Sequence, residues 1–90
     1  MGEIADRIRS KLESALAPVR LDIQDDSAKH SGHSGAREGG ESHFSVLIVS
    51  SAFEGLSRVA RQRRVNTILA EELAGPVHAL SIQAKTPAEA

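Results

Sequence analysis

The chain has 90 residues, 40% of them apolar and 26% charged, which suits one small globular domain over residues 1–90. Eleven Lys and Arg against twelve Asp and Glu leave a formal net charge of -1, which excludes a uniformly basic nucleic-acid coat. The absence of cysteine excludes disulfides, a thiolate nucleophile and a metal site built from the chain's own thiolates. No apolar run approaches the roughly 20 residues that span a bilayer. We therefore expect a cytoplasmic protein without membrane contact.

The first third of the chain predicts a helix followed by a strand. Apolar residues recur every four positions over residues 3–16, with charged residues between them, as in an amphipathic helix that Pro18 ends. From Val19 the period changes to two, which indicates a half-buried strand over residues 19–24.

A long loop and a buried strand follow. Residues 27–42 contain four Gly, four Ser and two His, a composition that cannot form a core and predicts a flexible loop. Residues 43–49 are apolar apart from Ser45 after the opening His43, which is typical of a buried strand. We expect this strand to pair antiparallel with the first one.

The next segment predicts helices. An Arg-rich stretch precedes apolar residues at helical spacing, and Gly75-Pro76 ends the pattern. The pattern does not decide between one helix and two. We prefer a short first helix, a turn near residues 61–64 and a longer second helix.

The end of the chain predicts a third strand over residues 77–84, in which His78 shares one face with Leu80 and Ile82. Residues 85–90 form a polar tail that we expect to fray. The element order is α-β-β-α-α-β, which predicts an α+β fold with a three-stranded mixed sheet covered by helices on one face. Because helices separate the last two strands, these strands should be parallel.

The four histidines are the candidate metal ligands, since neutral imidazole is a common ligand. His30 and His33 form an H-x-x-H pair in the loop, whose plainer interpretation is solvated polar filler. His78 should be half-buried at the mouth of the last strand, with its ring edge reachable, and its plainer interpretation is a core-edge residue. His43 fits a strand-capping role better than a ligand role.

No catalytic motif is present, so we expect a protein that is not an enzyme. The one basic cluster lies between residues 58 and 64. It is either an ordinary solvated helix surface or a patch that contacts phosphate or an acidic partner.

Five strings taken together resemble the BolA family. They are Asp25-x-Ser27 with Lys29-His30; Glu41-Ser42-His43-Phe44 leading into Val46-x-x-Val49-Ser50; Phe53-x-Gly55; Arg64-Val65 with Leu69-Ala70-Glu71-Glu72-Leu73; and Val77-His78-Ala79-Leu80. Each string is weak alone, but their order covers nearly the whole chain.

The resemblance implies a fold similar to class II KH domains and a monothiol glutaredoxin as partner. It also implies a bridging 2Fe-2S cluster, shared with glutaredoxin and glutathione and absent from the isolated chain. By position, one ligand falls on His78 and the other on His30, with His33 as a rival because the loop is long. Such a protein would assemble, transfer or sense iron-sulfur clusters.

The alternative function is DNA-binding transcriptional regulation, which the resemblance also implies. A helix-turn-helix around Arg61, Arg63 and Arg64 would present arginines to phosphates. A third alternative is a protein-interaction module without metal. The sequence leaves open whether the isolated chain is a monomer or a weak dimer.

Overall fold

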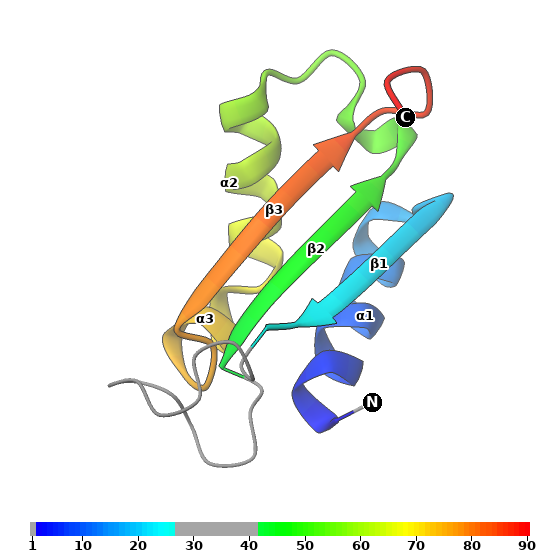
Figure 1. Cartoon of the computed structure of the whole chain (residues 1–90). Coiled ribbons are helices and arrows are strands. Elements are labelled where there is room, and N and C mark those ends of the chain that lie inside the picture. The colour runs from blue at the N-terminus through cyan, green and yellow to red at the C-terminus, as the bar shows by residue number, and fades with distance from the viewer. Residues whose placement is uncertain (1, 27–41) are drawn as a thin grey trace.

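The computed structural model describes residues 2–26 and 42–90, and it confirms the α+β fold with a mixed three-stranded sheet (Figure 1). The strand order is β1-β2-β3, with β1 antiparallel and β3 parallel to the central β2. No helix in the described part of the chain is long and apolar enough to cross a membrane. The bounds are α1 Glu3–Leu16, β1 Arg20–Asp25, β2 His43–Val49, the 3-10 helix η2 Ser51–Phe53, α2 Arg58–Ile68, α3 Ala70–Ala74 and β3 Ala79–Lys85.

The core lies between one face of the sheet and the helices, which all cover that face (Figure 1). Helix α1 contributes an apolar stripe at the predicted spacing, and alternate residues of β2 point toward it. Pairing in register places Ile23 beside Val46 and Val46 beside Ile82, so the inward side chains form continuous rows. The buried apolar side chains include Ile8, Leu12, Phe44, Ile48, Phe53, Val65 and Leu69.

Helix α1 ends at Leu16, as the sequence predicts, and its C-cap is Ala17, the residue before Pro18. Ala17 has a left-handed backbone (φ 44°), and its N–H donates to the Glu13 carbonyl at 3.1 Å. A residue before proline is disfavoured in helical conformation, which explains why the helix ends there. The strand that follows starts at Arg20, so Val19 is 73% exposed and the prediction that it is part of the half-buried strand is wrong.

The third strand also starts later than predicted, at Ala79. Val77 is buried and His78 is exposed, the reverse of the predicted faces. Alternation requires a regular strand backbone, which begins only at Ala79. From there Leu80 and Ile82 are partly buried against the core, as predicted.

The predicted turn near residues 61–64 is wrong, because α2 is continuous through them. Ser57 caps this helix by accepting a hydrogen bond from the Ala60 N–H at 3.1 Å, and arginine is a good helix former. The break comes at Leu69, after Thr67, whose hydroxyl donates to the Arg63 carbonyl. No helix-turn-helix therefore forms around residues 61–64.

The C-terminal segment is tied down, which corrects the expectation that residues 85–90 fray. Thr86 is buried, and the Glu89 carboxylate accepts two hydrogen bonds from the Arg61 guanidinium, at 2.5 and 3.1 Å. Arg61 is only 9% exposed, and it also donates to two backbone carbonyls at 3.0 and 3.1 Å. This bidentate pair is the geometry in which guanidinium and carboxylate bind each other best.

A second ion-pair network joins α1 to α3. The Glu72 side chain is 1% exposed, and its carboxylate lies 2.8 Å from the Arg7 guanidinium and 2.9 Å from the Lys11 ammonium. Lys11 also contacts the exposed Glu71 at 2.9 Å. Arg7 and Lys11 both remain partly exposed to solvent. Two partly solvated cations of α1 therefore balance the charge of a buried carboxylate on α3.

The Glu89 contact predicts an acid-dependent loss of stability. The hydrogen bond from Arg61, aided by the Thr86 N–H, lowers the pKa of Glu89 from 4.5 to about 2. A carboxylate with a depressed pKa stabilises the fold above its unfolded pKa, and this contribution is lost as pH falls from 4.5 toward 2. We expect Glu89→Gln to flatten the pH dependence of the free energy of unfolding in this window, measured by urea denaturation. Glu13→Gln, on the exposed face of α1, is the control, and equal slopes for wild type and Glu89→Gln would contradict the prediction.

The α1–α3 network predicts a stability difference between two adjacent carboxylates. Glu72→Gln keeps the shape but removes the charge that Arg7 and Lys11 face, so we expect the free energy of unfolding at pH 7 to fall by about 1–3 kcal/mol. Glu71→Gln should cost much less, because the Glu71 side chain is 79% exposed. Urea denaturation of both variants measures the difference, and equal losses would show that burial of Glu72 is not what matters.

Candidate metal centre at one end of the sheet

Parallel pairing of β2 with β3 brings two histidines together. His43 opens β2 and lies opposite Ala79, so His78 comes directly before the same end of β3. The two imidazole rings are stacked, with centroids 6.3 Å apart and an angle of 23° between their planes. His78 is exposed and His43 is partly buried. The two rings therefore form one patch that solvent and a partner can reach.

Ser42 holds both histidines in place. It is fully buried, and its carbonyl accepts hydrogen bonds from the N–H groups of His78 and Ala79 at 2.7 and 3.3 Å. Its hydroxyl is hydrogen-bonded to Nδ1 of His43 at 2.8 Å, in a direction set by the tautomer of the ring. We call Ser42, His43 and His78 the histidine rim.

The turn that precedes His78 is also fixed from within. The Glu72 carbonyl accepts hydrogen bonds from the N–H groups of Gly75 and Val77, at 3.2 and 2.9 Å. The Val77 side chain is 3% exposed and packs in the core. The structure corrects our expectation that His78 is half-buried: the ring is exposed, but the residues on either side of it are anchored.

Both flanks of the 27–41 segment reach the histidine rim. On one side, the Asp26 N–H donates to the His43 carbonyl at 2.7 Å, and the Ser45 hydroxyl donates to the Asp26 carboxylate. On the other side, Ser42 belongs to the rim itself. His30 and His33 lie outside the described residues, between these two anchors.

Among the described residues, the histidine rim does not by itself complete a metal site. Within residues 2–26 and 42–90, no group of three or more His, Cys, Asp or Glu side chains could hold a metal ion. Two imidazoles at one reachable patch are suitable ligands for iron, but they leave a coordination sphere incomplete. A metal held at the histidine rim would need further ligands, from outside the described residues or from another molecule.

The three arginines that are candidate nucleic-acid contacts differ in their exposure to solvent. Arg63 and Arg64 are exposed on α2, as a phosphate contact requires. Arg61 is buried, and the Glu89 carboxylate and two backbone carbonyls occupy its donors. Hydrogen bonding to Glu89 raises the pKa of Arg61, so it remains a cation that serves the fold.

Two residues of this end have larger roles than the sequence suggested. His43 is expected to cap or pack the start of its strand, and the structure adds that its ring stacks on that of His78. The signal was available, because the predicted parallel strands each open at one of these histidines. Glu72 had no such signal, since its burial follows from how α3 packs against α1.

A family model described as BolA-like protein matches residues 12–89. The human "BolA-like protein 1" is 51% identical over 89 residues, which cover 99% of this chain and 62% of that protein. The Arabidopsis thaliana "SufE-like protein 1, chloroplastic/mitochondrial" is 48% identical over 93 residues, covering 99% of this chain and 25% of that protein. The chain thus spans less than two thirds of the length of both of these relatives. These names include organelle forms, so the cytoplasmic location stays a prediction.

Solved structures agree with this match. The BolA domain of SufE1 from Arabidopsis thaliana has a TM-score of 0.90 at 49% identity, covering 100% of this chain and 99% of that one. The solution structure of BolA1 from Mus musculus has a TM-score of 0.80 at 51% identity, covering 98% and 68%. Sequence and fold agree over nearly the whole chain, and the protein belongs to the BolA-like family.

Proposed function

We propose that this chain is a binding protein, not an enzyme, that lends histidine ligands to a bridging 2Fe-2S cluster held with a monothiol glutaredoxin. The observation that supports this best is the exposed His78 ring. It is stacked on His43, where both flanks of the 27–41 segment begin. In this role the chain assembles, transfers or senses iron-sulfur clusters, and the cluster is its cargo.

The ligand count supports a shared site. A 2Fe-2S cluster takes four protein or thiol ligands, which are thiolates in most proteins. This chain has no cysteine and so cannot supply any of them as thiolate. If it provides two imidazoles, the other two ligands are thiolates of glutaredoxin and glutathione. Replacing thiolates by neutral imidazoles on one iron raises the reduction potential of the cluster and makes binding depend on pH.

The described residues suggest a division of roles. His78 is the fixed ligand, because the Ser42 carbonyl and the buried Val77 hold its backbone while its ring faces solvent. We assign the second ligand to His30 or His33, which lie between Asp26 and Ser42 in the sequence; both of those flanking residues are hydrogen-bonded at this end of the sheet. His43 orients the patch by stacking on His78.

The DNA-binding alternative loses its motif, because α2 is continuous where a helix-turn-helix was expected. Arg63 and Arg64 remain exposed candidates for phosphate contacts. Two exposed arginines on one helix are also an ordinary solvated surface, so we favour the cluster-binding function.

We expect His78→Ala to abolish the mixed cluster. The chain is mixed with a monothiol glutaredoxin, glutathione, iron and sulfide under anaerobic conditions, and visible absorption and circular dichroism are recorded. Wild type should give a spectrum unlike that of the glutaredoxin homodimer, and His78→Ala should leave only the homodimer spectrum. His78→Cys should retain a mixed cluster with a shifted spectrum, since a thiolate can replace imidazole. Far-UV circular dichroism controls for folding, and an unchanged visible spectrum in His78→Ala would remove His78 from the ligand set.

The second ligand can be assigned by comparing three single variants in the same titration. His30→Ala or His33→Ala should abolish the mixed spectrum, and the other should leave it nearly unchanged. His43→Ala should shift the spectrum without abolishing it, because its proposed role is to orient His78. If His43→Ala alone abolishes the spectrum and both loop variants are silent, the second ligand is His43 and the assignment to the loop is wrong.

A further inference from the structure

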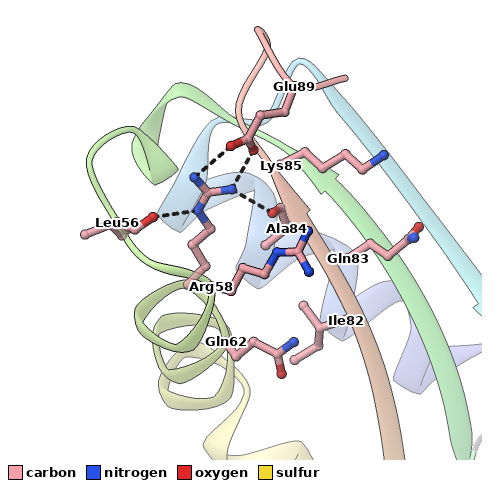
Figure 2. Close-up of a pocket in the computed structure, with 9 residues that line it drawn as sticks. Leu56, Arg58, Gln62, Ile82, Gln83, Ala84, Lys85 and Glu89 are labelled. Carbon is pink, nitrogen blue, oxygen red and sulfur yellow. Dashed lines mark hydrogen bonds and ion pairs between the residues drawn. The ribbon is translucent and has the colours of Figure 1, made fainter.

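A hollow of about 630 Å³ lies between α2 and β3, lined by the last residues of β3. The histidine rim lies at the first residues of β3, so the two features occupy opposite ends of that strand. Figure 2 shows side chains of the helix and the strand facing each other across the hollow, with Gln62 opposite Ile82. We call this hollow, between residues 58–62 and 82–85, the edge groove.

The edge groove includes the outer edge of β3 itself. Residues 82–85 are consecutive, and all four line it. Ile82 and Ala84 point toward the core, whereas Gln83 and Lys85 point to the opposite face of the sheet. Four consecutive residues whose side chains alternate between the two faces line the hollow, so it runs along the backbone of β3. Within the described part of the chain, β3 is the outer strand of the sheet on this side.

The groove carries uncompensated positive charge. Arg58 and Lys85 line it, and no carboxylate of the described residues forms an ion pair with either of them. Arg61 also lines it and donates to the Glu89 carboxylate, which the chain's own C-terminal segment supplies. Figure 2 labels this glutamate at the end of the hollow. The hollow thus already binds one carboxylate, and Arg58 and Lys85 are two further cationic residues in its lining.

We propose that the edge groove binds an extended acidic segment of a partner protein. The segment adds a strand to the edge of β3, and its carboxylates contact Arg58 and Lys85. The outer edge of β3 offers backbone groups for main-chain hydrogen bonds, apart from the Ala84 carbonyl, which accepts from Arg61 at 3.1 Å. Such bonds give affinity, while side-chain contacts give selectivity. Hydrogen bonds between guanidinium or ammonium and carboxylate groups supply the charge preference.

A second copy of this chain fits the groove less well than an acidic segment. Strand β3 reads ALSIQAK and contains no acidic residue. A second copy pairing through β3 would therefore bring no carboxylate of that strand to Arg58 or Lys85.

The test uses two synthetic peptides of six residues, one alternating glutamate and valine and the other alternating lysine and valine. Nuclear magnetic resonance of the ¹⁵N-labelled full chain follows the titration. The glutamate peptide should shift amide signals of residues 58–62 and 81–85, slow hydrogen exchange in β3 and lose affinity as salt rises. The lysine peptide should not bind. Two further glutamate peptides carry N-methyl groups on one edge or on the other, which removes the N–H donors of that edge. The peptide whose methylated edge would pair with β3 should bind more weakly than the other.

Matched variants locate the charge contribution. Arg58→Gln with Lys85→Gln should weaken binding of the glutamate peptide at least about fivefold, on the scale of two partly exposed ion pairs. Arg63→Gln with Arg64→Gln removes the same charge from α2 outside the groove and should leave binding unchanged. If both double variants weaken peptide binding equally, the interaction depends only on net charge and the proposal is overturned.

Three other outcomes would also overturn it. They are no binding up to millimolar peptide, signal shifts confined to residues away from the groove, and dimerisation through β3 seen by analytical ultracentrifugation. The last of these would assign the groove to a second copy. The cluster titration with His78→Ala is a separate measurement at the other end of the sheet, so either proposal can fail without the other.

Discussion

The parallel pairing of β2 with β3 is the constraint from which the candidate site follows. Parallel strands begin at the same end of a sheet, so the residues that open them become neighbours. This is why His43 and His78, far apart in sequence, stack their rings at 6.3 Å. Because β1 is antiparallel to β2, it ends where β2 begins, and both flanks of the 27–41 segment reach the same place. An antiparallel β3 would have placed His78 at the opposite end of the sheet.

The crossover that permits this pairing is held by contacts inside the fold. Helices α2 and α3 carry the chain back along one face of the sheet, and the Glu72 side chain joins α3 to α1 through Arg7 and Lys11. The same residue accepts the Val77 N–H with its backbone carbonyl, directly before His78. The exposed His78 ring is therefore attached to a backbone that buried residues hold in place, so a partner can reach the ring without backbone motion.

The sequence was sufficient for features that depend on local periodicity. The i, i+4 stripe of α1, the apolar run of β2 and the Gly75-Pro76 stop are local patterns, and the helix, strand and parallel crossover follow from them. The errors lie where tertiary contacts override local pattern. Glu89 binds Arg61 from 28 residues away and orders the C-terminal segment, and residues 61–64, where we expect a turn, continue a capped helix. The stacking of His43 on His78 follows from strand register, which no single segment contains.

The distance between the two proposed surfaces bears on how they could act together. Strand β3 has seven residues, so its ends are separated by about 20 Å at the rise of an extended strand. Charges in solvent are largely screened beyond a Debye length of about 8 Å at physiological ionic strength. Arg58 and Lys85 therefore have little effect on the potential of a cluster at the histidine rim. Any coupling between the two surfaces would have to pass through the packed sheet, or through a partner long enough to contact both ends of β3. An extended segment of about six residues already spans that length, so one partner could occupy the groove and approach the histidines without any change in the fold.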